Sequence, residues 1–135
     1  PAAWTSPLTD ALSRRWSDTP IHRMSSDESE AVKLLQNAHS AVKVSLFNEF
    51  RLLADKLGLN WERVLQGLLT GGWVNPMHTR VPGHDGLMGW GGKCFEKDLS
   101  CLISQMVAAN LDPVVTSAAL VRNREIDRKP DRTEP

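Results

Sequence analysis

The residues best suited to chemistry lie around Cys94, at the end of a glycine-rich stretch that reads GLMGWGGKCFEKD from Gly86 to Asp98. The pattern predicts a flexible turn that delivers the cysteine to the start of a helix, where backbone N–H groups carry partial positive charge. Lys93 and Lys97 flank the thiol, and both effects favour the nucleophilic thiolate. The glycines also let backbone N–H groups approach a ligand closely. A buried structural cysteine at a helix start fits the same pattern, so the spacing leaves both interpretations open.

A second group of polar residues falls at helical spacing. Lys33 and Asn37 are four residues apart in the longest predicted helix, so they share one face. They would place an ammonium and an amide side by side toward a cleft, although a solvated helix face has the same spacing. Asp98 follows Cys94 by four residues, about one helical turn. Its structural role would be to balance the helix dipole.

Three histidines are candidate general bases for Cys94, in the manner of a cysteine hydrolase or transferase: His39, His78 and His84. Nothing in the sequence fixes their distance from the thiol. The four histidines of the chain are scattered and form no metal-binding pattern, so we expect no metal site. Cys101 lacks the neighbours of Cys94 and falls on the apolar side of its predicted helix, so we expect it in the core.

One long predicted helix would position the polar pair. Ser25 and Glu28 have the spacing of a capping box, which satisfies free backbone N–H groups at a helix start. Gly58 is a good C-terminal stop. The helix runs about 30 residues, or roughly 45 Å, and we expect it to be a spine against which other helices or a second copy of the chain pack. Its apolar stripe consists of Val32, Leu35, Val42, Leu46, Phe50, Leu53 and Leu57.

The rest of the chain is predicted to form shorter helices and one long linker, and the fold class is all-α. The linker, residues 70–93, holds seven of the nine glycines, and loops this long are usually functional or disordered. Shorter helices are expected at 8–16, at 61–69 after an Asn60 cap, at 95–110, and at 113–126 after an Asp112 cap.

The predicted domain organisation has three parts. Residues 1–24, with an extended piece at 20–24, are too short for a sheet and are interpreted as the remnant of a preceding nucleotide-binding domain. Residues 25–127 form the helical domain, and the charged tail 128–135 is expected to be disordered. The chain does not begin with Met, which suggests a piece of a longer protein.

Composition excludes several functional classes. The 135 residues carry 16 basic and 16 acidic side chains, whereas a protein that coats nucleic acid or an anionic membrane is normally far more basic. No apolar run approaches the roughly 20 residues that span a bilayer. Two cysteines cannot form a disulfide framework, and reduced thiols point to the cytoplasm. There is no GxGxxG, phosphate-loop or HExxH motif.

Two blocks resemble the UDP-glucose/GDP-mannose dehydrogenase family. The first, EAVKLLQNA from Glu30 with the later segments KVS and FNE, is similar to the family's central helix. The second, HTRVPGHDGLMGWGGKCFEKD from His78 to Asp98, resembles its active-site cysteine motif. The blocks occur in the family's order and separation, and the resemblance covers about residues 18–127. The Lys-Asp after the cysteine resembles the UDP-glucose and GDP-mannose enzymes more than those acting on N-acetylated sugars.

The resemblance implies oxidation of the C6 alcohol of a nucleotide sugar, UDP-glucose first, to the carboxylate with two NAD per sugar. Cys94 would form a thiohemiacetal and then a thioester. Lys33 would stabilise oxyanion charge, Asn37 would hold the C6 oxygen or a water, and Asp98 would orient or activate the water. The long helix would form the core of a homodimer. Sugar binding would involve Lys33, Asn37, Asp85, Gly86, Gly89, Trp90 and Gly91, and the nicotinamide would lie against Cys94, Phe95 and Lys97.

The resemblance also implies what this chain lacks. Most of the NAD-binding domain would be missing, so we expect the chain alone to be inert as a dehydrogenase. Trp73 stands in a loop where family members often carry an Arg that reaches into the partner subunit's site. Two other functions remain open: a non-catalytic helical dimerisation module, and a cysteine hydrolase or transferase.

Overall fold

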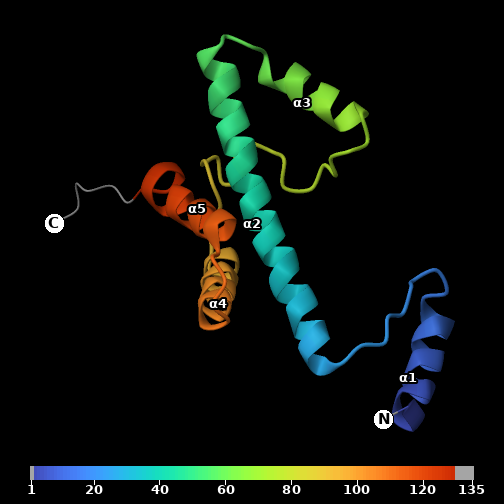
Figure 1. Cartoon of the computed structure of the whole chain (residues 1–135). Helices are drawn as coiled ribbons and strands as arrows, with labels where there is room; N and C mark the ends of the chain where they lie inside the picture. Colours follow the sequence, from blue (N-terminus) through green and yellow to red (C-terminus); the bar gives the residue numbers. More distant parts are fainter. Residues whose placement is uncertain (1, 130–135) are drawn as a thin grey trace. The chain divides into compact units, whose positions relative to one another are not determined.

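The computed structural model describes residues 2–129, with side chains from residue 7 onward, and its regular structure in that range is helical throughout, as predicted (Figure 1). No strand occurs among these residues. The tail predicted to be disordered, 128–135, lies outside the description from residue 130. The helices are α1 (Ala2–Arg15), α2 (Ser26–Lys56), α3 (Trp61–Thr70), α4 (Cys94–Ala108), α5 (Val114–Arg122) and a π-helical turn, η1 (Asn123–Asp127).

The chain divides into two compact units, and the first comprises residues 1–30. Its helix α1 begins before the predicted start at Leu8 and contains Pro7 within it. Residues 20–25 have no regular structure before α2 begins. Trp16 is exposed, with the Arg15 guanidinium 5.3 Å from its ring centroid. The interpretation of residues 1–24 as a domain remnant stays a prediction.

Local signals set the ends of α2 where the sequence predicts them. The Ser25 N–H donates to Glu28 Oε2 at 2.6 Å, and the Glu28 N–H donates to Ser25 Oγ at 3.2 Å. At the other end, Gly58 has a φ of 67°, and the Leu59 N–H reaches back to the Ala54 carbonyl at 2.8 Å. Glycine adopts this left-handed conformation without the steric cost of a Cβ, which ends the helix.

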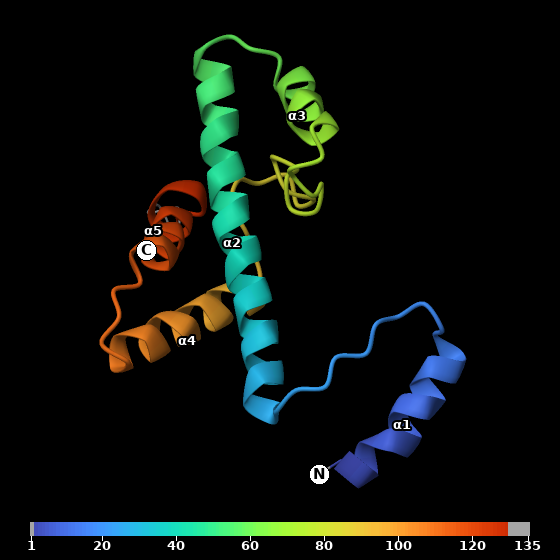
Figure 2. The ribbon, with the colours of Figure 1, turned by 45° about the vertical axis from the view of Figure 1, so that its right-hand side comes forward.

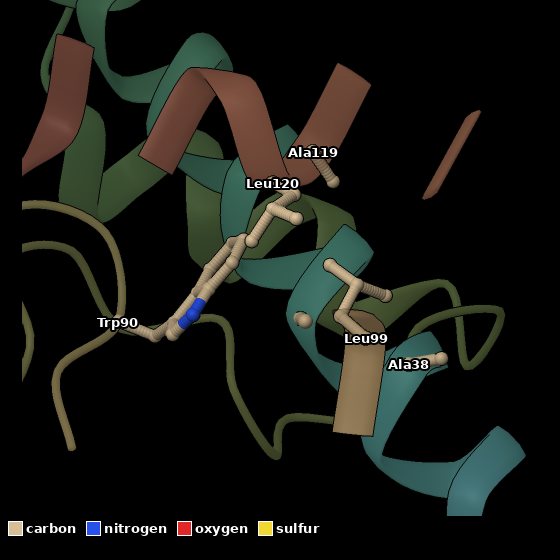
Figure 3. Packing of buried hydrophobic residues seen from close by; sticks show 6 residues of the cluster. Ala38, Trp90, Leu99, Ala119 and Leu120 are labelled. Atoms are coloured by element: carbon tan, nitrogen blue, oxygen red, sulfur yellow. The ribbon is translucent and has the colours of Figure 1, made fainter. Parts of the chain in front are cut away.

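The second unit, residues 31–135, has its main core where α2 presents small side chains. Ala38 and Ala41 of α2 pack with Leu99 of α4, and with Ala119 and Leu120 of α5 (Figure 3). Small residues let helix backbones approach closely, so larger side chains from the neighbours fill the space. The Trp90 ring joins the same cluster from the linker. This core fixes the linker's C-terminal end against three helices.

The apolar stripe predicted on α2 is mostly exposed in the single chain. Leu53 is 58% exposed and Leu57 is 62% exposed, and Val42 alone packs against the core described above. The helix buries a different, smaller-residue face, because α4 and α5 dock on Ala38 and Ala41. The exposed members of the stripe are Val32, Leu35, Leu46, Phe50, Leu53 and Leu57.

A second cluster joins α3 to the far part of α2. Phe47 and Ala54 pack with Trp61 and with Val81 of the linker. Asn60 caps α3 as predicted, because its Oδ1 accepts from the Arg63 N–H at 2.9 Å. In both views α3 lies on one side of α2, whereas α4 and α5 lie on the other (Figures 1 and 2). Residues 71–93 therefore carry the chain from one side of α2 to the other.

Side chains of α2 hold this linker by its backbone. Lys43 donates to the Asn75 carbonyl, and Arg51 donates to the Val81 carbonyl at 3.3 Å. The linker has no helix or strand between residues 71 and 93, so such bonds replace the ladder that would otherwise satisfy its carbonyls. Trp73, in the loop where family members often carry an Arg, is 94% exposed.

Three predictions about the C-terminal helices need correction. Cys101 is exposed, not part of the core, because α4 buries the face that carries Asp98 and Leu99. Pro113, rather than Asp112, is the N-cap of α5, and its ψ of 52° is not helical. The helix predicted at 113–126 is split into α5 and η1. Among the described residues, no helix is both long enough and apolar enough to cross a membrane.

Candidate active site

The centre of the first polar cluster is Asp98, which is 8% exposed on the first turns of α4. Its carboxylate accepts hydrogen bonds from the Asn37 amide and from the Lys97 ammonium. The Lys33 Nζ lies 3.6 Å from Asp98 Oδ2. The structure therefore brings Lys33 and Asn37 of α2 together with Asp98 of α4, which follows Asn37 by 61 residues in the sequence. Lys97, which is expected at the cofactor, pairs with Asp98 in this structure.

The charges of this cluster fix its protonation. The hydrogen bond from Lys97, then the one from Asn37, holds the pKa of Asp98 below its ordinary value, and Asp98 in turn raises the pKa of Lys97. At neutral pH the group is a carboxylate between two ammonium groups and an amide. A carboxylate with a lowered pKa is a weak base, so this geometry suits orientation and charge balance better than proton abstraction.

Cys94 is exposed at the start of α4 and lines a cavity of about 570 Å³. The thiol lies one turn before Asp98 on the same helix. The cavity wall combines cations with two histidines and one carboxylate, so it suits an anionic ligand. Its polar lining residues beside Cys94 are His78, Arg80, His84, Asp85, Lys93 and Arg128.

The predicted ligand-binding residues fall into two groups. Those of the turn line the cavity with Cys94, namely Asp85, Gly89, Trp90 and Gly91, together with Phe95 of α4. Gly86 is not part of that lining, and neither are the residues of the Asp98 cluster. Trp90 is buried within the core as well as facing the cavity, and its Nε1 has no hydrogen-bond partner. Its ring lies edge-on to Phe95, at 6.3 Å between centroids.

Two buried asparagines hold the turn: Asn48, which lies in the FNE segment of the family resemblance, and Asn123, which is not among the predicted site residues. Asn48 of α2 accepts from the Gly89 N–H at 2.9 Å. Asn123, the first residue of η1, accepts from the Trp90 N–H at 2.9 Å and donates to the Trp90 carbonyl at 3.1 Å. For Asn48, the sequence signal is an amide in the middle of a helix whose neighbouring residues are buried, because a buried amide needs hydrogen-bond partners. Nothing in the sequence indicates which partners.

A second set of contacts ties the C-terminal segment to the same turn. Arg128 pairs with Asp85 at 2.6 Å, and this bond lowers the pKa of Asp85. Arg122 bridges Glu49 of α2 and the buried Asp127, at 3.0 and 3.1 Å. Burial raises the pKa of Asp127, although Arg122 opposes that effect. The turn is therefore enclosed by α2 on one side and by residues 122–128 on the other.

The histidines give no support for a thiol–imidazole pair. His78 has a φ of 63° and packs its ring edge-on against Phe95 at 5.5 Å. Burial, and then the charge of Lys43, lowers the pKa of His78. His78 and His84 line the cavity with Cys94 and His39 does not, and no hydrogen bond joins any of the three to the thiol among the described residues. In the same range, no three metal-ligating side chains gather closely enough to hold an ion. A cysteine hydrolase would need the histidine contact.

Comparison with known proteins gives consistent matches. The family model described as the UDP-glucose/GDP-mannose dehydrogenase family, central domain, matches residues 27–125. The chain is 29% identical to UDP-glucose 6-dehydrogenase AglM of Haloferax volcanii over 90% of its length, and 31% identical to UDP-glucose 6-dehydrogenase of Campylobacter jejuni over 81%. It is 33% identical to UDP-N-acetyl-D-mannosamine dehydrogenase of Pyrococcus horikoshii over 72%.

The matched segment is a limited part of these relatives. It spans 26% of the Haloferax and Campylobacter proteins and 22% of the Pyrococcus protein. No solved structure matches the chain at a significant level. The two blocks that carry the sequence resemblance, around Lys33 and around Cys94, both fall inside the matched family segment.

Proposed function

Because the chain belongs to the UDP-glucose/GDP-mannose dehydrogenase family, as its central domain, we propose that it supplies the nucleophile and part of the polar site of an NAD-dependent nucleotide-sugar 6-dehydrogenase. The substrate we favour is UDP-glucose, with GDP-mannose next. The observation that carries the proposal is the convergence of Lys33 and Asn37 on Asp98, one turn after an exposed Cys94 that opens to a cavity.

Cys94 would act on the aldehyde formed by the first oxidation at C6. Its thiolate adds to the carbonyl carbon, a C–S bond forms, and the carbonyl electron pair moves to oxygen, which takes a proton to give a thiohemiacetal. Loss of a hydride from that carbon and a proton from its hydroxyl gives a thioester. Water then adds to the thioester carbon, the C–S bond breaks, and the thiolate and the carboxylate result, with two protons released to solvent. The intermediate divides one difficult oxidation into easier steps.

The Asp98 cluster would stabilise charge during these steps. The Lys33 side chain is 66% exposed, so its ammonium is free to approach an oxyanion at C6 and still balance the carboxylate. Asn37 would orient the C6 oxygen or the water, and its hydrogen bond to Asp98 fixes the direction of its amide. Preorganised donors of this kind are worth most where charge develops in the transition state.

The turn before Cys94 would hold the sugar. Asp85, Gly89, Trp90 and Gly91 line the cavity, and Gly86, with a φ of 78°, shapes the turn beside them. The cations of the cavity suit the diphosphate of a nucleotide sugar, because guanidinium groups bind phosphate oxygens in a bidentate manner. Arg128 is already paired with Asp85, so a diphosphate would compete with that carboxylate.

NAD, when bound, accepts one hydride at each of the two oxidations. In this chain, Cys94 and Phe95 line the cavity and would face the reacting end of that cofactor. The described residues contain no strand followed by a glycine-rich turn, the element that cradles a dinucleotide. Residues 2–129 therefore fit one end of the cofactor only, and by themselves would not oxidise the sugar.

The proposal extends to assembly and location. A homodimer through α2 would bury the six exposed apolar residues of the stripe. Two free cysteines, Cys94 and Cys101, are suited to the reducing cytoplasm, where nucleotide sugars would be available. A helical module that only dimerises would use the same stripe and leave Cys94 idle, so the stripe does not discriminate between these functions.

The decisive experiment measures NADH formation from UDP-glucose, GDP-mannose and a UDP-N-acetylated sugar. The sample is the protein encoded by the whole reading frame around this chain, with the 135-residue chain as a control. We expect two NADH per sugar from one substrate. Cys94→Ser should abolish formation of the carboxylate, because an alcohol is a far weaker nucleophile than a thiolate. Cys101→Ser, at the other exposed cysteine of the same helix, is the matched control and should be unaffected.

Each outcome has a defined meaning. Undiminished oxidation to the carboxylate by the Cys94→Ser protein would refute the nucleophile. Absence of NADH with all three sugars, in a folded protein, would favour the dimerisation module. A reaction that needs no NAD would favour a hydrolase or transferase instead.

A further inference from the structure

Two asparagines are buried where the cysteine turn meets the helices. Asn48 is 1% exposed and Asn123 is 5% exposed, which is unusual for a residue type that is mostly found at the surface. Each side chain accepts one hydrogen bond and donates one. Asn48 also donates to the Val44 carbonyl at 2.6 Å within α2, while Asn123 both accepts from and donates to the backbone of Trp90.

Asn123 begins the π-helical turn that follows α5. The Arg128 N–H reaches the Asn123 carbonyl at 2.7 Å, five residues back, instead of the α-helical four. Such widened turns are rare and frequently lie at functional sites. The turn places both Asn123 and Asp127 against Gly89, which has a φ of 67°. A Cβ on Gly89 would meet the Asn123 Oδ1 and would come within 2.7 Å of the Asp127 Cβ.

The backbone held by the two asparagines leads directly to the thiol. Only Gly91, Gly92 and Lys93 separate Trp90 from Cys94, and Gly91 lies against the Arg128 guanidinium. Glycines are the most flexible residues of the chain, so this short segment does not fix the position of Cys94 by itself. On the N-terminal side of Cys94, the nearest backbone held by these side-chain hydrogen bonds is that of Gly89 and Trp90.

We propose that Asn48 and Asn123 are positioning residues for Cys94: their hydrogen bonds to Gly89 and Trp90 set where the thiol stands at the start of α4. The inference rests on the proposed function, in which Cys94 is the nucleophile. When these hydrogen bonds are intact, the backbone before Cys94 is held and the thiol opens to the cavity from the start of α4. When they are lost, the glycine segment relaxes and the thiol loses that position.

The test uses the 135-residue chain and compares two cysteines in one molecule. Cys94 and Cys101 are both exposed and both on α4, so their alkylation by iodoacetamide, followed by mass spectrometry of the two peptides, gives a ratio that cancels reagent and concentration effects. We expect Cys94 to react faster in the unchanged chain. Asn123→Ala and Asn48→Ala should lower this ratio, and Asn123→Ala should lower it more, because it removes two bonds to the turn rather than one.

Ser45→Ala is the matched control. Ser45 is buried on α2 near Asn48 and donates to the Ala119 carbonyl of α5 at 3.4 Å, so its removal also loses a buried hydrogen bond between helices. It has no bond to the turn. We expect this variant to lose stability and to keep the Cys94-to-Cys101 ratio. If general loosening of the fold controlled the ratio, Ser45→Ala would lower it as the two asparagine variants do.

The outcomes separate this inference from the proposed function. If Cys94 reacts no faster than Cys101 in the unchanged chain, the nucleophile assignment and the inference fall together. If Cys94 is preferred but both asparagine variants keep the preference while folded by circular dichroism, the positioning role alone is wrong. Unfolding of Asn123→Ala leaves Asn48→Ala to decide, and unfolding of both would overturn the inference in favour of a purely structural role.

In the protein from the whole reading frame, the same variants provide a second readout. Misplacement of a reacting group by about 1 Å costs on the order of 10²-fold in rate. We therefore expect Asn123→Ala to lower kcat for the carboxylate by up to that factor with little change in KM. A rise in KM alone would contradict a positioning role for the thiol.

Discussion

Asn37 of α2 donates a hydrogen bond to Asp98 of α4, across 61 residues of sequence. The bond joins the long helix to the helix that begins with Cys94, at a buried carboxylate that also pairs with two lysines. The packing of α4 on α2 therefore sets the position of Cys94 relative to Lys33 and Asn37. The hydrogen bond from Lys97, and then the one from Asn37, lowers the pKa of Asp98, so acid should loosen the contact.

Asp98→Asn tests this electrostatic link. The folded pKa of Asp98 lies below its ordinary value of 3.8, so its contribution to stability is present in full above that pH and is lost as the pH falls through the folded pKa. We expect the difference in unfolding free energy between the chain and the variant to be constant above about pH 5 and to shrink in stronger acid. Urea denaturation at a series of pH values measures it. A difference that stays constant throughout would refute the assignment.

Lys33→Ala should separate catalysis from stability. The lysine is largely exposed and its ion pair with Asp98 spans 3.6 Å, so its loss should change the unfolding free energy by less than about 1 kcal/mol. In the protein from the whole reading frame, kcat should fall by about 10²–10³-fold if the ammonium stabilises an oxyanion. Lys56→Ala, also on α2, is the control for charge. Global unfolding of the Lys33 variant would indicate a structural role instead.

Gly89→Ala, with Gly86→Ala as its control, tests the close contact between Gly89 and η1. Both glycines have a positive φ, so alanine costs about 1–2 kcal/mol in backbone strain at either position. A Cβ at Gly86 has nothing within 4 Å, whereas one at Gly89 meets Asn123 and Asp127. We expect Gly89→Ala to be the more destabilising by about 1–3 kcal/mol in urea unfolding. Equal losses would mean that η1 does not press on the turn.

Leu53→Glu tests the homodimer proposed to form through α2. Leu53 is 58% exposed in the apolar stripe, and a carboxylate there would be costly to bury against a second copy. Lys56→Glu, also exposed on α2, introduces the same side chain without removing an apolar one. By analytical ultracentrifugation we expect the unchanged chain and the lysine variant to sediment as dimers and the leucine variant as a monomer. An unchanged chain that is monomeric at micromolar concentration would contradict the proposal.

Local features of the fold follow from short stretches of sequence. The capping box at Ser25 and Glu28 and the cap at Asn60 depend on residues within four positions of each helix end, and the structure has these contacts where the sequence predicts them. The stop at Gly58 is of the same kind. The motif spacing around Lys33 and Cys94 likewise lies within single helices or one turn, so it indicated the family segment that the comparisons match.

Other features depend on which helix faces meet, and only the tertiary structure decided them. Cys101 and most of the apolar stripe on α2 are exposed because α4 and α5 dock on Ala38 and Ala41. Helical periodicity alone does not predict which of these faces is buried. The same docking brings Asn123 of the C-terminal segment to Trp90, 33 residues away in sequence. A buried amide needs a hydrogen-bond partner. Its partner is the group that helix packing brings within bonding distance, and the order of residues along the chain does not give that distance.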